Sequence, residues 1–240
     1  MLPSDACRES VETFNKLAER YAAKYFDLTQ YDRYYAMLAE RLPFGGSVID
    51  VACGPGTVSA YLKRARPDLS VVGTDLAPRM IDEARQRVPG GVFHVSDCRD
   101  LEGFDSDAFE GAVFAFGLSY LTDLDAQRCF AALVRRLKSG APLLLATITG
   151  PSASRYEQSS SGERVFMVYR TPDAVHALLQ AAGFRIVFSE LIASPENAAL
   201  ATTDLLVLAV RVATQAPSNV TCGAGEPCAV KSPASDNLEP

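Results

Sequence analysis

Apolar positions near the start of the chain recur with a helical period. Between residues 8 and 28, apolar side chains are spaced three and four residues apart, at Val11, Phe14, Leu17, Ala18, Tyr21 and Tyr25. This spacing places them on one stripe and predicts an amphipathic helix. A second helix is expected from Asp32 to Leu42, because Pro43 follows the end of its apolar pattern.

Tyrosine is dense in these two predicted helices, at Tyr21, Tyr25, Tyr31, Tyr34 and Tyr35. A tyrosine ring has a large apolar body and one hydroxyl group that seeks a partner. The rings can therefore pack the helices onto the rest of the fold, or form a lid whose hydroxyls reach a ligand. We expect residues 1–42 to form an N-terminal helical lid, with simple packing as the alternative for any single ring.

From residue 48 onward, short apolar runs alternate with helical stretches. The helical stretches begin near Thr57, Pro78, Asp125 and Thr171. The apolar runs predict strands at 48–51, 70–75, 91–96, 111–116, 142–149, 184–189 and 204–211, and residues 165–169 are a candidate for one more. Strands that alternate with helices favour a mostly parallel sheet covered by helices on both faces.

Two polar segments interrupt this rhythm. Residues 150–163 are rich in serine and are predicted to form a long flexible surface loop. Residues 213–240 are rich in Pro, Ser, Gly and Asn, and are predicted to be a disordered tail. The tail contains Cys222 and Cys228, but nothing else in it would complete a metal or redox site. The main domain is therefore expected over residues 43–212.

The stretch from Val48 to Thr57 combines a buried strand, a turn with two glycines and the start of a helix. Gly54 and Gly56 would let the backbone approach a ligand closely. A dinucleotide-binding fingerprint would need a third glycine at the position of Ser59, and an acid, Asp50, lies inside the strand. An ordinary glycine-rich turn without a ligand is the alternative.

Acidic residues end the next two predicted strands. Asp75 follows Gly56 by 19 residues, and Asp97 ends the third strand. In an open parallel sheet, ligands bind at the carboxyl ends of the strands. Asp75 is therefore expected to hold the two hydroxyls of a ribose, or alternatively to cap the helix that begins at Pro78.

Composition excludes several classes of function. The chain has 240 residues, of which 48% are hydrophobic, and a net charge of −6. An acidic chain is a poor partner for nucleic acid, and no apolar run is long enough for a membrane span. The six cysteines show no close pairing and there are two histidines. We therefore expect a cytoplasmic protein with no metal site and no nucleic-acid or membrane partner.

Four stretches together resemble a known family. The D-x-A-x-G-x-G pattern from Asp50 to Gly56 resembles motif I of the class I S-adenosylmethionine (SAM) dependent methyltransferases, with Ala52 in place of the first glycine. Residues 72–80 resemble their second motif, residues 93–101 their third-strand motif, and residues 116–121 their fourth-strand exit. Residues 14–21 resemble their N-terminal lid helix. The chain is similar to the small-molecule group of glycine N-methyltransferase and ubiquinone-biosynthesis types.

The resemblance implies a doubly wound, seven-stranded, mostly parallel α/β sheet of Rossmann-like type, and SAM as the cofactor. It implies that the glycine turn approaches the methionine part and ribose of SAM, and that Asp75 holds the ribose hydroxyls. Leu76 and Asp97 would contact the adenine, together with the backbone N–H of Cys98. The Phe116 carbonyl would contact the methionine end. Tyr21, Tyr25 or Arg33 would contact the carboxylate of the methionine part of SAM. The residues expected to bind the cofactor are therefore Tyr21, Tyr25, Arg33, Asp50, Ala52, Gly54, Gly56, Asp75, Leu76, Asp97, Cys98 and Phe116.

The implied reaction transfers a methyl group to an oxygen or nitrogen of a small molecule by in-line displacement. SAM is already activated, so the protein has only to align the acceptor and exclude water. Tyr120 and Ser119, just past the fourth strand, are the candidates for acceptor contact. The alternatives are a SAM-binding sensor or scaffold without catalysis, and a methyltransferase acting on protein or RNA. The sequence does not separate a monomer from a homodimer.

Overall fold

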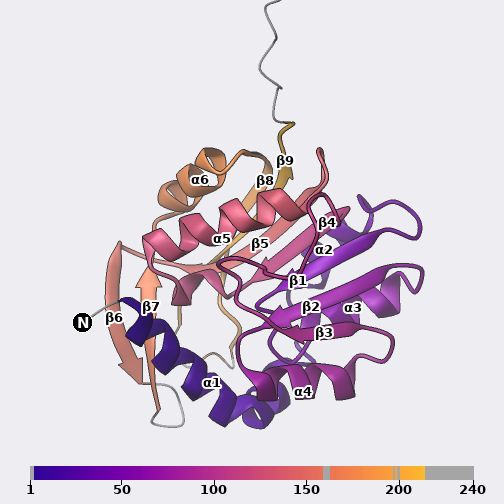
Figure 1. Ribbon diagram of the computed structural model, residues 1–240. Coiled ribbons are helices and arrows are strands. Elements are labelled where there is room, and N and C mark those ends of the chain that lie inside the picture. Colours follow the sequence, from indigo (N-terminus) through magenta and orange to yellow (C-terminus); the bar gives the residue numbers. More distant parts are fainter. Residues whose placement is uncertain (1–2, 159–162, 197, 199–200, 214–240) are drawn as a thin grey trace, which may run out of the picture.

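The computed structural model describes residues 3–158, 163–196, 198 and 201–213 (Figure 1). The predicted tail from residue 214 onward, with Cys222 and Cys228, lies outside the described residues. The helices are α1 (Pro3–Tyr25), α2 (Asp32–Ala39), α3 (Thr57–Ala65), α4 (Pro78–Arg87), α5 (Asp123–Arg136) and α6 (Pro172–Ala181), with a short 3₁₀ turn, η1, at Leu118–Tyr120.

Nine strands form one large sheet and one hairpin in the described part of the chain. They are β1 (Ser47–Val51), β2 (Ser70–Asp75), β3 (Val92–Val95), β4 (Gly111–Ala115), β5 (Pro142–Thr149), β6 (Ala153–Gln158), β7 (Arg164–Tyr169), β8 (Phe184–Ala193) and β9 (Thr203–Arg211). The large sheet has the order β3-β2-β1-β4-β5-β9-β8. Strands β1 to β5 are parallel, and β9 is antiparallel to both β5 and β8. This confirms the predicted seven-stranded, mostly parallel α/β fold.

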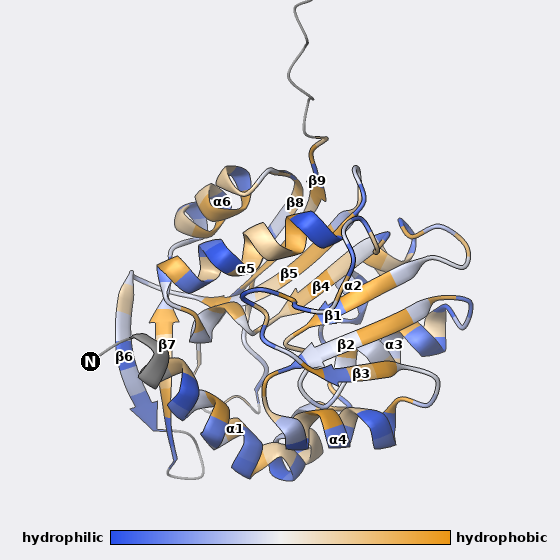
Figure 2. Cartoon of the chain, viewed as in Figure 1, coloured by the Kyte–Doolittle hydropathy of each residue, from blue (hydrophilic) through white to orange (hydrophobic). Residues whose placement is uncertain are grey.

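Helices cover both faces of this sheet because side chains alternate along each buried strand. In β1, Ile49 belongs to the core beneath α5 and α6, where it lies with Phe130 and Val175. Its neighbour Val48 belongs to the opposite core, beneath α2 and α3, with Leu38. Figure 2 shows the apolar colour concentrated on the strands, with the polar colour on the outer sides of the helices.

The connections after β4 and β7 begin helices through side-chain caps. The Thr122 side chain accepts a hydrogen bond from the backbone N–H of Asp125 at the start of α5. Thr171 does the same for Ala174 at the start of α6, where Pro172 occupies the first turn. Such caps satisfy N–H groups that the helix itself leaves unpaired. These local signals explain why both helices begin within two residues of the starts that the sequence predicted.

Residues 150–163 do not form the predicted loop throughout, and this expectation was wrong. Residues Ala153–Gln158 form β6, which pairs antiparallel with β7 over its whole length, from Ala153 opposite Tyr169 to Gln158 opposite Arg164. The segment reads as polar because the side chains of β6 are mostly exposed or half-buried. The hairpin lies beside α1, apart from the large sheet (Figure 1).

The two N-terminal helices differ in what they cover. Helix α2 packs into the sheet core, and Tyr34, Tyr35 and Leu38 are each at most 2% exposed. Helix α1 instead packs against α4 and the hairpin. Thr13 donates a hydrogen bond to the Arg164 carbonyl at 2.7 Å, and the Ser10 hydroxyl accepts one from the Phe166 N–H at 2.9 Å. A lid stays a prediction. Because α2 is part of the sheet core, the lid could consist of α1 but not of all of residues 1–42.

Candidate functional site

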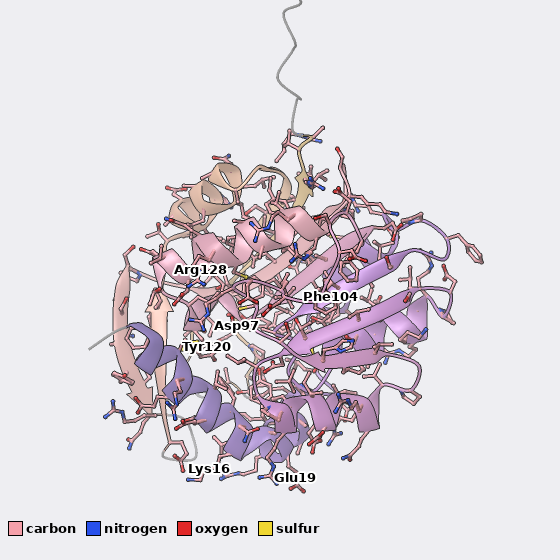
Figure 3. All side chains as sticks on the ribbon, in the orientation of Figure 1. Lys16, Glu19, Asp97, Phe104, Tyr120 and Arg128 are labelled. Carbon is pink, nitrogen blue, oxygen red and sulfur yellow. The ribbon has the colours of Figure 1, made fainter. Side chains whose placement is uncertain are left out.

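Two adjoining cavities lie at the carboxyl edge of the parallel strands, beneath α1. The larger has a volume of about 400 Å³ and the smaller about 110 Å³. Both are lined by Phe14, Tyr21, Ala52, Gly54, Ala115, Phe116 and Tyr120. These shared residues come from α1, the turn after β1 and the exit of β4. Asp97 and Tyr120 lie in the middle of the molecule between α1 and α5, whereas Lys16 and Glu19 point outward (Figure 3).

The turn after β1 forms the wall where the cavities meet. Ala52, Gly54 and Gly56 all have left-handed backbone conformations, with φ of 52°, 54° and 84°. A Cβ atom at Gly54 would meet no atom within 4 Å, so this glycine faces open space that a ligand can fill. Gly56 lines neither cavity. A Cβ there would come within 2.8 Å of Val88, so Gly56 allows the turn to pack against the end of α4.

Ala52, which replaces the first glycine of the motif, has a left-handed backbone conformation that glycine adopts more easily. A non-glycine residue in the left-handed region is disfavoured by roughly 1–2 kcal/mol. Phe116, at the exit of β4, has the same kind of conformation with φ of 62°, and its N–H donates to the Ala146 carbonyl at 2.7 Å. Both residues line the two cavities, and backbone strain of this kind gathers at functional sites.

Asp75 lies at the end of β2 and lines the smaller cavity. One carboxylate oxygen accepts from the Gly54 N–H at 2.9 Å, and the other accepts from the Ala77 N–H at 2.9 Å. Burial raises the pKa of this carboxyl group, and the backbone hydrogen bonds oppose the rise. Both interpretations of Asp75 are therefore compatible with the structure: it supports the turn and the start of α4, and it faces the cavity.

Asp97, Leu76 and Cys98 also line the smaller cavity. Arg99 holds the Asp97 carboxylate through its guanidinium, at 2.5 Å from Nη2 to Oδ2, and through its backbone N–H at 2.9 Å. Burial raises the pKa of Asp97, but these hydrogen bonds outweigh burial and leave it lowered. Asp97 is thus a fixed negative acceptor. The pKa of the Cys98 thiol is raised well above its usual value by a hydrogen bond with Cys129 and by burial.

Asp50 lies inside β1 and is 1% exposed. The Ser59 hydroxyl donates to its carboxylate at 2.7 Å, which explains a serine where a dinucleotide-binding turn would carry glycine. Burial raises the pKa of Asp50 to about 7, although the Ser59 hydrogen bonds oppose the change. Asp50 lines the larger cavity together with Ala52. The buried surroundings of Asp50 therefore disfavour the charged form of its carboxyl group.

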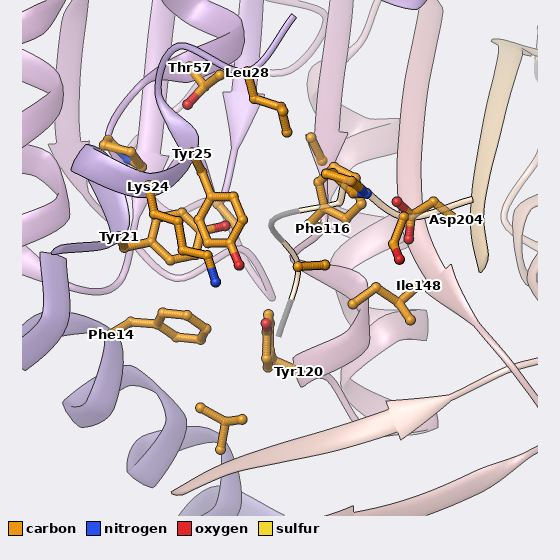
Figure 4. Close-up of a pocket in the computed structure, with 18 of the residues that line it drawn as sticks. Phe14, Tyr21, Lys24, Tyr25, Leu28, Thr57, Phe116, Tyr120, Ile148 and Asp204 are labelled. Carbon is orange, nitrogen blue, oxygen red and sulfur yellow. The ribbon is translucent and has the colours of Figure 1, made fainter. Parts of the chain in front are cut away.

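The larger cavity is lined mainly by aromatic and apolar side chains, as Figure 4 shows. The Phe14 and Tyr120 rings meet edge to face with centroids 4.8 Å apart, and the Tyr31 and Phe116 rings are 5.1 Å apart. The β6–β7 hairpin closes one side with Glu157, Gln158, Val165, Met167 and Tyr169. Such a lining suits a flat apolar molecule that is oriented by a few polar groups.

Three predicted site residues line neither cavity, which corrects the sequence analysis: Gly56, described above, Arg33 and Ser119. Arg33 is directed to the surface, where its Nη2 pairs with the Glu190 carboxylate at 2.6 Å and its side chain is 61% exposed. Ser119 is buried in η1, with its hydroxyl 3.2 Å from that of Thr147. Arg33 lies in the first turn of α2, and η1 buries Ser119 while Tyr120 lines both cavities.

The structure adds four charged residues to the lining of the larger cavity: Arg20, Lys24, Glu157 and Asp204. Arg20 and Lys24 are four apart on α1 and flank Tyr21 and Tyr25, so their spacing could have identified them. Asp204 is the second residue of β9 and pairs with Ile148 of β5. Because β9 is antiparallel, its first residues lie at the same edge as the carboxyl ends of the other strands, and only the strand direction reveals this.

Comparisons with known proteins agree with this geometry. A family profile described as "Methyltransferase domain" matches residues 48–140. The chain is 25% identical over 216 residues to a demethylmenaquinone methyltransferase of Thermotoga maritima, covering 77% of this chain and 91% of that protein. It is 33% identical over 177 residues to a malonyl-(acyl-carrier protein) O-methyltransferase of Herminiimonas arsenicoxydans, covering 70% of this chain and 65% of that protein.

Solved structures share the fold. A 1,6-didemethyltoxoflavin-N1-methyltransferase of Burkholderia thailandensis, with bound 1,6-didemethyltoxoflavin and S-adenosylhomocysteine, superposes with a TM-score of 0.70 at 18% identity and covers 89% of this chain and 92% of that one. A SAM-dependent methyltransferase of Methanosarcina mazei superposes with a TM-score of 0.64 at 20% identity, covering 73% of this chain and 97% of that one. At these identities the likeness shows the fold alone.

Proposed function

Because the chain belongs to the class I SAM-dependent methyltransferases, whose cofactor is SAM, we propose that it methylates an oxygen or nitrogen atom of a small molecule. One observation carries the proposal: a small cavity with fixed carboxylates adjoins a large aromatic cavity, and the two meet at Gly54 and Phe116. The smaller cavity has carboxylates, Asp75 and Asp97, that can accept hydrogen bonds from the ribose and the base of a nucleoside. The larger cavity has the size and lining of an acceptor site.

The residues that line the smaller cavity fit the adenosine part of SAM. Asp75 would hold the ribose hydroxyls, and Leu76 would pack on the adenine. Asp97 would accept from the adenine amino group, next to the backbone N–H of Cys98. The open space at Gly54 supports close approach of the ligand.

The shared wall and α1 would hold the methionine part. The Phe116 carbonyl would accept from its amino group, and Tyr21 and Tyr25 would face its carboxylate. Lys24 and Arg20 supply positive charge at that place, which Arg33 cannot do from the surface. In Figure 4, Lys24 extends from α1 into the cavity beside the Tyr25 ring.

When bound, SAM supplies a methyl group on an electron-poor sulfonium, ready for direct displacement. The protein would contribute alignment and exclusion of water. Tyr120 lines both cavities and would position the acceptor, and burial raises the pKa of its hydroxyl, so it stays neutral. Helix α1 and the β6–β7 hairpin would cover the reacting atoms.

Two observations favour catalysis on a small molecule over the alternatives. A SAM-binding sensor has no need of a second cavity of about 400 Å³ lined by aromatic rings. A net charge of −6 disfavours RNA as the acceptor. The free thiols Cys7, Cys53, Cys98 and Cys129 agree with a reducing cytoplasm as the place of action.

Labelled SAM, incubated with the full chain and a metabolite extract, tests this proposal. We expect label in one or a few small molecules, identified by mass spectrometry, and much less labelled product from the Asp75→Ala variant at a low SAM concentration. Calorimetry on the same samples should show binding of SAM and S-adenosylhomocysteine. Binding of NAD with no response to SAM would overturn the proposal.

A further inference from the structure

Asp204 lines the larger cavity with a buried carboxylate, one oxygen of which has no hydrogen-bond partner in the part of the chain that the structure describes. The residue is 1% exposed and lines that cavity. Its Oδ2 accepts from the Tyr31 hydroxyl at 2.6 Å, whereas Oδ1 has no hydrogen-bond partner among the described residues. Figure 4 shows the carboxylate beside Ile148, directed toward the space in front of Tyr120.

A structural role does not account for both oxygens. Holding the Tyr31 hydroxyl takes one acceptor, which Oδ2 provides. Leaving a second buried acceptor unpaired destabilises the folded protein, and such groups in native proteins call for an explanation. A ligand that donates a hydrogen bond from within the cavity removes this cost.

Within the described ranges, the other charged groups that line the cavity do not combine a fixed carboxylate with an oxygen that lacks a donor. Asp50 accepts from Ser59. Glu157 accepts from the Tyr169 hydroxyl at 2.8 Å and pairs with Arg155 at 2.8 Å. The cations Arg20 and Lys24 come from α1, whereas Asp204 is held from β9 and Tyr31. Asp204 is therefore the carboxylate whose position is fixed and whose second oxygen still needs a donor.

We propose that Asp204 binds the methyl acceptor through an O–H or N–H group and receives its proton, and that the acceptor is a neutral, planar aromatic compound bearing a hydroxyl or ring N–H. This inference rests on the proposed methyltransferase function. The flat apolar part would lie among rings such as Phe14, Phe116 and Tyr120, and the single donor would face Asp204. A hydroxyl or N–H is also the kind of group that becomes nucleophilic on losing its proton.

The step balances as follows. The O–H or N–H bond of the acceptor breaks and its proton passes to Oδ1 of Asp204. The electron pair left on the acceptor forms the new bond to the methyl carbon, while the carbon–sulfur bond of SAM breaks and its electron pair stays on sulfur. Burial raises the pKa of Asp204, against the hydrogen bond from Tyr31, and this makes the carboxylate a stronger base toward a weakly acidic donor.

A matched pair of small aromatic compounds tests the proposal on the full chain loaded with S-adenosylhomocysteine. The pair is 2-naphthol and 2-methoxynaphthalene, which share the ring system and differ in that a methyl group replaces the hydroxyl hydrogen. We expect 2-naphthol to bind at least tenfold more tightly, which corresponds to about 1.4 kcal/mol. Because 2-naphthol emits at a different wavelength once it has lost its proton, we also expect increased naphtholate emission from the bound compound.

Three variants assign the effect to Asp204. In Asp204→Asn the tenfold preference and the naphtholate emission should both disappear, while SAM affinity stays within threefold. Tyr31→Phe keeps the carboxylate and should keep the preference for 2-naphthol. Asp105→Asn changes an exposed aspartate outside both cavities and should behave as the unchanged protein.

Several outcomes would overturn the proposal. Equal affinity of the unchanged protein for the two compounds, or no binding of either, would do so even if Asp204→Asn failed to fold. The proposal would also be overturned if a folded Asp204→Asn kept the preference for 2-naphthol. It would be overturned as well if 2-naphthylmethylammonium, a cationic compound of similar shape, bound more tightly than 2-naphthol. If SAM still binds in those cases, the methyltransferase function stands and only the role of Asp204 fails; loss of SAM binding by the unchanged protein would remove both.

Discussion

The carboxylate of Asp75 accepts a hydrogen bond from the backbone N–H of Gly54, at 2.9 Å. This bond joins the end of β2 to the turn that follows β1, and it sets the position of the turn relative to the smaller cavity. The other carboxylate oxygen accepts from Ala77 and supports the start of α4. Because Asp75 supports the turn that would hold the ligand, its effects on stability and on binding are coupled.

We first predict that Asp75→Ala and Asp75→Asn each weaken SAM binding at least tenfold. Hydrogen bonds to charged groups contribute about 1.5–3 kcal/mol, and neither variant offers a carboxylate to the ribose. Each variant should also lower the melting temperature of the protein without ligand by several degrees, because a buried backbone N–H loses its acceptor. Calorimetry and thermal unfolding measure the two effects.

The control for this experiment is Asp82→Ala on α4, whose side chain is 62% exposed. It should leave SAM affinity and the melting temperature close to those of the unchanged protein. Normal SAM affinity in both Asp75 variants would show that the carboxylate serves only the turn and α4.

The second prediction concerns Asp50, whose pKa burial raises to about 7. An unfolded aspartate has a pKa near 3.9, so between these values the folded protein binds more protons than the unfolded one. The free energy of unfolding therefore falls as pH rises through this window. Asp50→Asn removes the ionisation, so it should stabilise the ligand-free protein more at pH 8 than at pH 5, by on the order of 2 kcal/mol.

Urea unfolding at the two pH values measures this difference. Asp105→Asn, which changes an exposed aspartate, should give no pH-dependent difference of that size. If Asp50→Asn changed the free energy of unfolding equally at pH 5 and pH 8, the carboxyl group would have an ordinary pKa in the folded protein.

Third, we predict that Lys24→Met weakens SAM binding about five- to tenfold and that Arg33→Met leaves it unchanged. Lys24 lines the larger cavity, whereas Arg33 pairs with Glu190 at the surface. A lost ion pair in a partly buried site is worth more than a lost surface pair. Calorimetry at two salt concentrations measures both effects, because screening should weaken binding by the unchanged protein more than by Lys24→Met. If Arg33→Met weakened SAM binding and Lys24→Met did not, Arg33 would be the cofactor contact instead.

Fourth, we predict that α1 behaves as a lid. SAM should slow amide hydrogen exchange in Pro3–Tyr25 more than in Asp32–Ala39, because α1 lines both cavities whereas α2 packs into the sheet core. Lids belong to the less stable parts of a fold, so a ligand beneath them has a large effect on their opening. Hydrogen exchange with mass detection measures both helices in one experiment, and α2 is the internal reference. Equal protection of α1 with and without SAM would leave ordinary packing as its role.

Local patterns were sufficient for most of the fold. Short apolar runs placed the strands of the large sheet, and caps such as Thr171 with Pro172 placed the helices, because these signals act within a few residues. The glycine turn and the strand-end acids Asp75 and Asp97 were found in the same way. All parallel strands end at one edge, so strand-end residues in the sequence are neighbours in space.

Tertiary packing decided what those local signals leave open. The hairpin of β6 and β7 was hidden because the side chains of β6 are mostly polar and exposed, so it carries little apolar periodicity. The direction of a side chain on a short turn separated Tyr120, which faces both cavities, from Ser119, which is buried beside Thr147. The antiparallel direction of β9 brought Asp204 to the cavity from a part of the chain distant from every motif, because only strand pairing determines which end of a strand reaches the ligand edge.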